Sequence, residues 1–197
     1  PEIPGVPETT LAPDFRNDLD SRISHDIKLL KGVQAWGESQ RLNALDLYDI
    51  NGEQPTVFPQ SLKATVNDNP EDIARLARQI LSLPINQQLN LRANERMSLV
   101  KIIRTRLEEF GILVLKNSDL EKCDARGLCI YNELLPVIIL SNESPTGSTF
   151  TLCHEVAHVV LNQSAVSGEI GSTQSQSQIY RIERWGNRFS GAFLVPL

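Results

Sequence analysis

Two histidines one helical turn apart constrain the fold of this chain more than any other feature. The run His154-Glu155-Val156-Ala157-His158 separates the two imidazoles by four residues. Because an α-helix turns by about 100° per residue, both rings leave the same face of a helix. They are then close enough to hold one cation, with the carboxylate of Glu155 beside the first of them. Only one further histidine occurs among the three in the chain.

The residues around this pair predict a helix buried against a core, because the segment is rich in apolar side chains: Phe150, Leu152, Val156, Val159, Val160 and Leu161. The spacing H-E-x-x-H is typical of zinc peptidases, in which the histidines bind the metal and the glutamate is the general base. A core helix with two hydrogen-bonded histidines is the alternative interpretation. We predict a metal site at His154 and His158, with Glu155 accepting a proton from a water molecule beside the metal.

Composition narrows the class of protein. A length of 197 residues suits one domain, or one domain with an extension, and 41% hydrophobic residues can form a sizeable core. The net charge of −5 argues against direct nucleic-acid binding by this segment. No apolar run approaches the ~20 residues that cross a bilayer, so we expect no membrane association. An odd count of three cysteines fits reduced thiols, which predicts a cytoplasmic location.

Hydrophobic spacing predicts an α+β fold. Spacings of three and four residues predict helices over about 13–48, 70–83, 93–110 and 178–194, besides the motif helix. Asn69 and Gly111 are expected to cap the second of these and to end the third. Short apolar runs predict a small three-stranded, mainly antiparallel sheet at 112–116, 127–131 and 137–140. Residues 163–177, rich in Gln, Ser and Gly, are expected to form a mobile surface loop.

A third metal ligand must come from a carboxylate. Catalytic zinc usually takes three protein ligands and keeps one position open, and no histidine follows His158. Glu169 and Glu183 are the two acidic residues that follow. We favour Glu183, because a predicted helix holds geometry better than the loop that contains Glu169. Asn187, one turn beyond Glu183, either hydrogen-bonds a liganding histidine or is an ordinary surface residue.

Three stretches resemble the ImmA/IrrE family of metallo-endopeptidases. The first, Phe150 to His158, resembles the family's Phe-Thr-Leu-Ala-His-Glu-Leu-x-His. The second, Ile182 to Pro196, resembles its closing helix, Glu-x-x-(Ala/Cys)-Asn-x-Phe-Ala-x-x-(Leu/Phe)-Leu-x-Pro. The third, 126–138, resembles the strand pair before the active helix. The similarity covers about 70–197. A weaker likeness through Pro13-Asp14-Phe15-Arg16 resembles members joined to an upstream helix-turn-helix domain.

The resemblance implies a zincin-like metallopeptidase that takes Zn²⁺, with Mn²⁺ as the alternative. Its pattern maps the ligands to His154, His158 and Glu183 and the base to Glu155. It implies cleavage of a helix-turn-helix transcriptional repressor, which switches on phage, mobile-element or stress-response genes. The chain departs from the family at Cys153, Gly186 and Ser190, where Ala, Ala or Cys, and Ala are usual.

The resemblance divides the chain into two parts. We expect an N-terminal extension over 1–69, with an amphipathic helix and an irregular linker, and an ImmA/IrrE-like metallopeptidase domain over 70–197. Family members usually continue beyond the Val-Pro pair before Leu197, so we expect this domain to be truncated there.

Several alternatives stay open at this stage. The same scaffold could be a catalytically latent, metal-bound interaction module, or a toxin–antitoxin regulator, that sequesters a transcription factor. A metal-free structural domain is a third class. Tyr131, Tyr180 and Arg188 are candidates for the donor that stabilises the oxyanion. Residues 137–140 are the candidate edge strand that pairs with an extended substrate.

Overall fold

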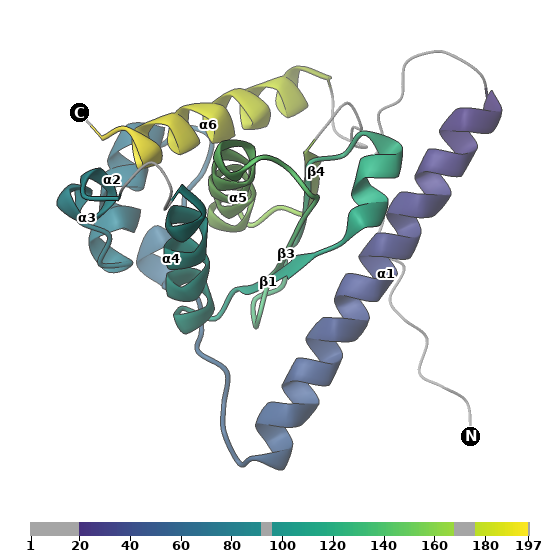
Figure 1. Cartoon of the computed structure of the whole chain (residues 1–197), viewed down its shortest axis with the longest axis horizontal. Coiled ribbons are helices and arrows are strands. Elements are labelled where there is room, and N and C mark those ends of the chain that lie inside the picture. Colours follow the sequence, from purple (N-terminus) through teal and green to yellow (C-terminus); the bar gives the residue numbers. More distant parts are fainter. Residues whose placement is uncertain (1–19, 92–95, 168–175, 197) are drawn as a thin grey trace.

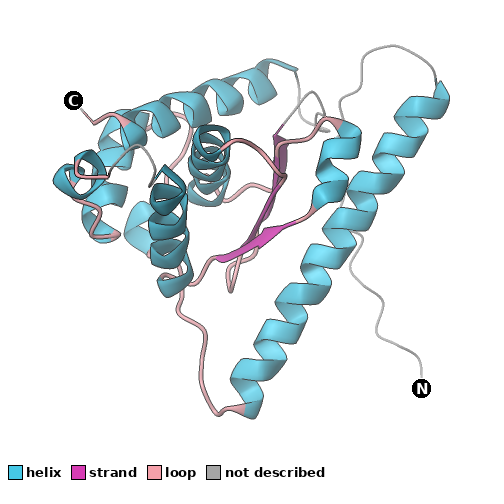
Figure 2. Cartoon of the chain, viewed as in Figure 1, coloured by secondary structure: helices cyan, strands magenta, loops and turns pink. Residues whose placement is uncertain are grey.

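A small sheet separates two groups of helices in the computed structural model of this chain (Figure 1). The structure describes residues 20–91, 96–167 and 176–196. Figure 2 shows that helices dominate and that the strands are short. The elements, in chain order, are α1 (Asp20–Ile50), η1 (Gln60–Leu62), α2 (Pro70–Ile80), α3 (Ile85–Leu89), α4 (Arg96–Glu109), β1 (Leu113–Lys116), η3 (Ser118–Cys123), β2 (Gly127–Ile130), β3 (Val137–Leu140), α5 (Pro145–Val160), β4 (Ala165–Ser167) and α6 (Gln176–Leu194).

The sheet has four strands in the order β1-β3-β2-β4. β1 runs parallel to β3, whereas β2 is antiparallel to both β3 and β4. The three predicted strands and the α+β class are therefore confirmed. β4 is an addition, because residues 165–167 lie in the segment that composition predicted to be loop. The rest of that segment, 168–175, is outside the described residues.

The position of β3 corrects one prediction. We expected residues 137–140 to offer a free edge to a substrate, but β1 and β2 flank this strand on its two sides. Its backbone groups are therefore already paired along the register from Val137 to Leu140. A local sequence pattern cannot show that β3 is a central strand, because strand order depends on the tertiary pairing of β3 with β1. The sheet ends at β1 and β4 among the described residues.

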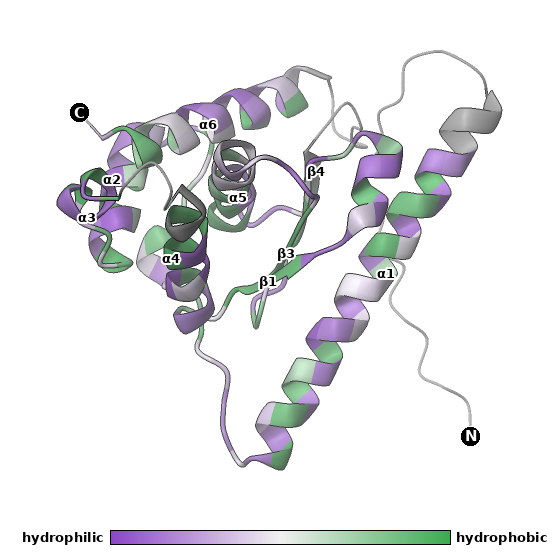
Figure 3. Ribbon diagram, viewed as in Figure 1, coloured by the Kyte–Doolittle hydropathy of each residue, from purple (hydrophilic) through white to green (hydrophobic). Residues whose placement is uncertain are grey.

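Alternating side chains divide the interior into two cores. In β3, Ile138 and Leu140 join a core with α5, while Val137 and Ile139 face α1. Successive residues of a strand point to opposite faces, so an unbroken apolar strand fits a sheet covered on both sides. Figure 3 shows hydrophobic residues along β3 and a mixture of both kinds along α1. We call these interiors the α5 core and the α1 core.

Helix ends follow the expected local chemistry. The side chain of Asn69 accepts a hydrogen bond from the backbone N–H of Glu71, and Pro70 is the first residue of α2. Gly111 ends the α4 segment with a φ of 79°, a conformation that suits glycine. The predicted helices over 70–83, 93–110 and 178–194 correspond to α2, α4 and α6. The first predicted helix is seen as α1 from Asp20, and its residues 13–19 lie outside the description.

Some residues that precede α2 are buried in the same core as residues of the later helices and strands. Phe58, Leu62 and Ala64 are buried in the α5 core, and the backbone N–H of Ala64 donates to the carbonyl of Val160. The division of the chain at residue 69 stays a prediction. All three cysteines are buried and free. In the described part of the chain, every helix is too short or too polar to span a membrane.

Candidate metal centre

α5 is the most deeply buried helix of the site. It begins at Pro145, with the side chain of Ser144 accepting a hydrogen bond from the backbone N–H of Gly147. From Thr151 to Val160 every residue is buried, because the sheet covers one side and α4 and α6 cover others. His154 and His158 therefore project from a helix whose backbone is held on several sides.

α6 brings the third side chain to the centre. Its buried face carries a stacked series of rings, Trp185, Phe189 and Phe193, with centroids 5.5 and 5.9 Å apart. Gly186 lets the two helices approach closely, since a Cβ there would lie 3.1 Å from Cε1 of His154. A small residue at 186 thus places Glu183, almost one turn earlier, over the histidine pair.

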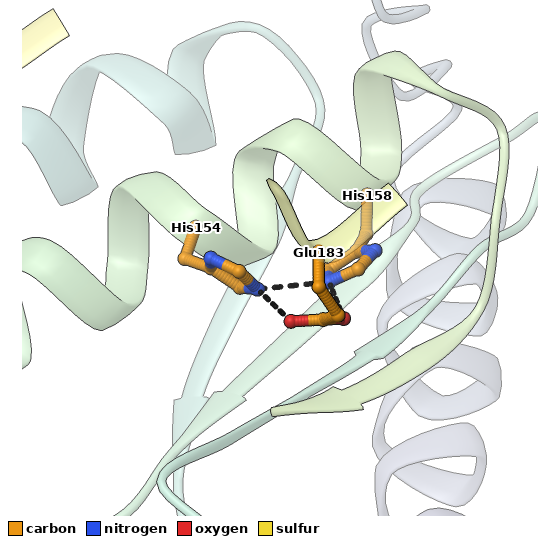
Figure 4. Close-up of side chains that lie close together, drawn as sticks. All are labelled: His154, His158 and Glu183. Carbon is orange, nitrogen blue, oxygen red and sulfur yellow. Dashed lines mark hydrogen bonds and ion pairs between the residues drawn. The ribbon is translucent and has the colours of Figure 1, made fainter. Parts of the chain in front are cut away.

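The three side chains converge on one point, as Figure 4 shows. The Nε2 atoms of His154 and His158 are 3.2 Å apart. The carboxylate of Glu183 spans both rings, with Oε2 3.1 Å from Nε2 of His154 and Oε1 3.5 Å from Nε2 of His158. Among the described residues this is the one group of three or more His, Cys, Asp or Glu side chains that could hold a metal ion.

These spacings and this donor set fit a zinc ion. Ligand atoms about 2.0–2.1 Å from a tetrahedral zinc are separated from each other by about 3.3 Å. The two Nε2 atoms are 3.2 Å apart, and the two Glu183 oxygens lie 3.1 Å from Nε2 of His154 and 3.5 Å from Nε2 of His158, all near that value. Two imidazoles and one carboxylate are also a donor set of catalytic zinc sites, which leave the fourth position open. The cluster can therefore hold a metal ion without rearrangement of the helices.

Electrostatics differ between the two histidines. Burial and the charge of the neighbouring His154 lower the pKa of His158 to about 4, against the opposing effect of the Glu183 charge. At His154 burial also acts to lower the pKa, but the hydrogen bond to Glu183 and the charges of Glu155 and Glu183 outweigh it and raise the value. His158 is thus neutral, as metal ligation requires, while His154 holds a proton more readily.

Glu183 is the most exposed member of the cluster, with 38% of its side chain accessible. Burial acts to raise its pKa, but the hydrogen bond from His154 and the charges of both histidines lower it overall. The carboxylate is therefore held in its ionised form beside the two rings.

Glu155 lies outside the three-residue cluster, on the side of α5 that faces the sheet. It is fully buried, and its carboxylate packs against Gly127 at the start of β2. The charge of Glu155 raises the pKa of His154, and burial together with that charge raises the pKa of Cys129 on β2. The Glu155 carboxylate is therefore near both the histidine cluster and the strand. A carboxylate beside the cluster but not part of it is the arrangement that a general base needs.

The other predicted site residues are placed as follows. Asn187 approaches the His154 ring closely enough for its amide to raise the pKa of that histidine. Within the described chain, however, the buried Nδ1 atoms of His154 and His158 meet no partner at full hydrogen-bond geometry. Glu169, the competing third ligand, lies outside the described residues.

The three oxyanion candidates stay predictions, and the structure gives their surroundings. Arg188 is engaged by Glu71, with Nη2 2.7 Å from Oε1. Tyr180 is an exposed side chain on α6, and the backbone N–H of Tyr131 bonds to the hydroxyl of Ser164. Sequence reasoning also missed the hydrogen bond from Thr151, one turn before Glu155, to the carboxylate of Glu143 at 2.6 Å. No spacing rule connects those two residues.

A buried helix with the H-E-x-x-H pair, joined by a carboxylate from a second helix, is the arrangement expected of a zincin-like metal site. A family model of the IrrE N-terminal-like domain, a peptidase family, matches residues 107–197. The match begins in α4 and includes the sheet, α5 and α6. Residues 107–197 thus match the peptidase family that the sequence resemblance predicted. Searches of the curated proteins and of the solved structures gave no match.

Proposed function

We propose that this chain is a zinc-dependent endopeptidase whose substrate is a helix-turn-helix transcriptional repressor. The observation that carries the proposal is the convergence of three metal-binding side chains within 4.8 Å of one another, with the buried Glu155 beside them. The match of residues 107–197 to a peptidase family model supports the peptidase class. The repressor as substrate rests on the resemblance to the ImmA/IrrE family.

In this proposal His154, His158 and Glu183 hold the metal ion. Zn²⁺ bound there would act as a Lewis acid, polarising the scissile carbonyl and acidifying water. Mn²⁺ is the alternative ion. The neutral state of His158 and the ionised state of Glu183 match what these ligands need.

Glu155 carries the proton in the reaction. It takes a proton from the attacking water as the water oxygen bonds to the carbonyl carbon. It then gives that proton to the amide nitrogen as the C–N bond breaks, which leaves a carboxylate and an amine. Because Glu155 is fully buried, its carboxylate exchanges protons with groups inside the site rather than with bulk solvent.

β4 replaces β3 as the strand edge for an extended substrate. It is the last strand of the sheet among the described residues and pairs on one side with β2 through Ala165, Val166 and Ser167. It also contacts α5, which carries the histidines. An extended peptide added to its free edge would gain backbone hydrogen bonds near the metal cluster.

The test is cleavage of a helix-turn-helix repressor from the same genome, followed by mass spectrometry of the fragments. We expect cleavage with zinc, and none after removal of the metal by a chelator. Glu155→Gln should keep one metal ion per chain and lower kcat by about 10²–10⁴-fold. The matched control is Glu133→Gln, which changes an exposed glutamate near the end of the sheet and should cut at the wild-type rate. A metal-loaded wild type that binds repressors and cuts none would favour the interaction module instead.

A further inference from the structure

The first residue of β2 is Gly127, although glycine does not stabilise a strand. Glycine weakens strands because it adds backbone entropy and no packing surface. The φ angle of Gly127 is also not in the positive range, which among the described glycines is limited to Gly52 and Gly111. Conformational freedom therefore does not explain Gly127. The remaining reason is space.

The space beside Gly127 is occupied by Glu155. A Cβ on residue 127 would overlap Oε1 of Glu155 and would lie 2.9 Å from its Cδ. It would also lie 2.8 Å from Cγ2 of Thr151, one turn earlier on α5. Even a methyl group at 127 is therefore too large while the carboxylate keeps its position.

The backbone of residue 127 has little freedom to retreat. Gly127 is paired with Leu140 on one side and with Ser167 on the other. The preceding carbonyl, of Arg126, accepts a hydrogen bond of 2.9 Å from the backbone N–H of Ser141. A strand bonded to both neighbours moves only if the sheet moves with it.

The helix on the other side is equally constrained. The Thr151 hydroxyl donates to Glu143 at 2.6 Å, and the backbone of α5 is buried around it. The Thr151 methyl group is held by that hydrogen bond, so its contact with the added Cβ lowers stability. The end of the Glu155 side chain can move away, because its torsions rotate. A Cβ at residue 127 would thus relocate the carboxylate rather than the strand or the helix.

We propose that Gly127 is a positioning residue, which sets the location of the Glu155 carboxylate by leaving room for it against β2. This inference rests on the proposed function for its consequence in catalysis, since Glu155 is the base there. Its geometric part, the direct contact between residue 127 and Glu155, stands independently of any activity.

The kinetic test is Gly127→Ala, compared with Gly37→Ala. The control glycine is also sterically restricted, since its Cβ would lie 2.6 Å from Cδ1 of Ile139, but it lies on α1 in the other core. We expect Gly127→Ala to lower kcat by roughly ten- to a hundredfold, because small misplacements of a reacting group cost that much. KM and the zinc content should not change. Gly37→Ala should lower stability and keep kcat per folded molecule. Equal kcat values for the two variants would overturn the proposal.

A second test uses stability and needs no substrate. Gly127→Ala is made in the wild type and in Glu155→Ala, and the loss in denaturation midpoint is compared in a double-mutant cycle. Both backgrounds also carry Thr151→Ser, which removes the Cγ2 atom that the added methyl group would meet at 2.8 Å and keeps the hydroxyl. We expect most of the loss to disappear when Glu155 is shortened, because the methyl group then has room. If Gly127→Ala with Thr151→Ser does not fold, adding Glu155→Ala should restore folding. Equal losses in both backgrounds would mean that the strand itself demands glycine, and would overturn the proposal. An inactive wild type would refute the proposed function and leave this cycle intact.

Discussion

α5 and α6 supply the same candidate metal centre but hold their side chains by different means. α5 is buried on all sides from Thr151 to Val160, and its histidines are 5% and 1% exposed. α6 buries one face only, and the Glu183 side chain is 38% exposed. The histidine pair is therefore fixed by the surrounding core, whereas the position of Glu183 depends on what anchors α6.

The anchors of α6 come from the segment before α4. Trp185 donates its indole N–H to the carbonyl of Asp68 at 2.8 Å, and Arg188 pairs with Glu71. At the far end of the helix, Arg78 donates to the carbonyl of Phe193 at 2.7 Å. Residues outside the matched domain thus position one of the three side chains of the candidate metal site.

The largest expected effect is at the most buried ligand. His158→Ala should abolish stoichiometric zinc binding and cleavage together, with zinc affinity reduced more than about 100-fold, since even outer contacts of a metal site are worth roughly 10–100-fold. Metal analysis by mass spectrometry after dialysis measures the zinc that stays bound per chain. His25→Ala, which removes an exposed histidine of α1, is the control and should bind zinc normally. Full zinc occupancy in His158→Ala would place the metal elsewhere.

Loosening α6 should have the next largest effect. Arg78→Met keeps the length of the side chain but loses the hydrogen bonds to Phe193 and Gln88. We expect about 2 kcal/mol less stability, because a buried carbonyl loses a charged partner, together with weaker zinc binding. Chemical denaturation and zinc titration measure the two effects. Arg75→Met, on the same helix but exposed and paired only with Asp72, should change stability by less than about 0.5 kcal/mol. If both variants behaved alike, the anchoring role of Arg78 would be wrong.

The two histidines should differ in their proton release. Because the pKa of His154 is raised above its ordinary 6.5, a proton occupies this ring below that pKa and competes with the metal. Zinc affinity should therefore rise with pH, by about tenfold per pH unit, and level off above the pKa of His154. His158, with a pKa of about 4 in the metal-free protein, releases no proton above that range. Calorimetry near pH 6, below the pKa of about 7 of a zinc-bound water, should find about one proton released per zinc in buffers of different ionisation enthalpy. Two protons released at that pH would contradict this difference.

The smallest effect is expected at Asn187. Its amide raises the pKa of His154 without belonging to the cluster, so Asn187→Ala should weaken zinc binding by about tenfold at most. The pKa of His154 in the metal-free protein should fall towards its ordinary value, which NMR titration of the ring can follow. Unchanged affinity and pKa would make Asn187 an ordinary surface residue.

Much of this centre could be predicted because its signals are local. The four-residue spacing of His154 and His158 follows from helix geometry, and the strands at 113–116, 127–130 and 137–140 follow from short apolar runs. The apolar face of the 178–194 segment predicts a helix, which favours Glu183 as the third ligand. The structure brings it to the histidines, while its role as a ligand stays a prediction.

The remaining features depend on tertiary pairing, which local patterns do not encode. β4 has three residues in a Ser- and Gln-rich segment and is a strand because β2 offers it a partner. β3 is a central strand because β1 pairs with its second edge. α3, a five-residue helix after Pro84, is too short to show a period. The closeness of Gly127 to Glu155 appears only when α5 lies on the sheet.

X-ray absorption spectroscopy of the zinc-loaded full chain tests the central claim most directly. The account predicts one zinc per chain, with two imidazole nitrogens at about 2.0–2.1 Å, oxygen ligands for the remainder and no sulfur. In Glu183→Ala the imidazole signal should persist while occupancy falls. A zinc with thiolate sulfur at about 2.3 Å, or a spectrum and occupancy untouched by Glu183→Ala, would contradict it.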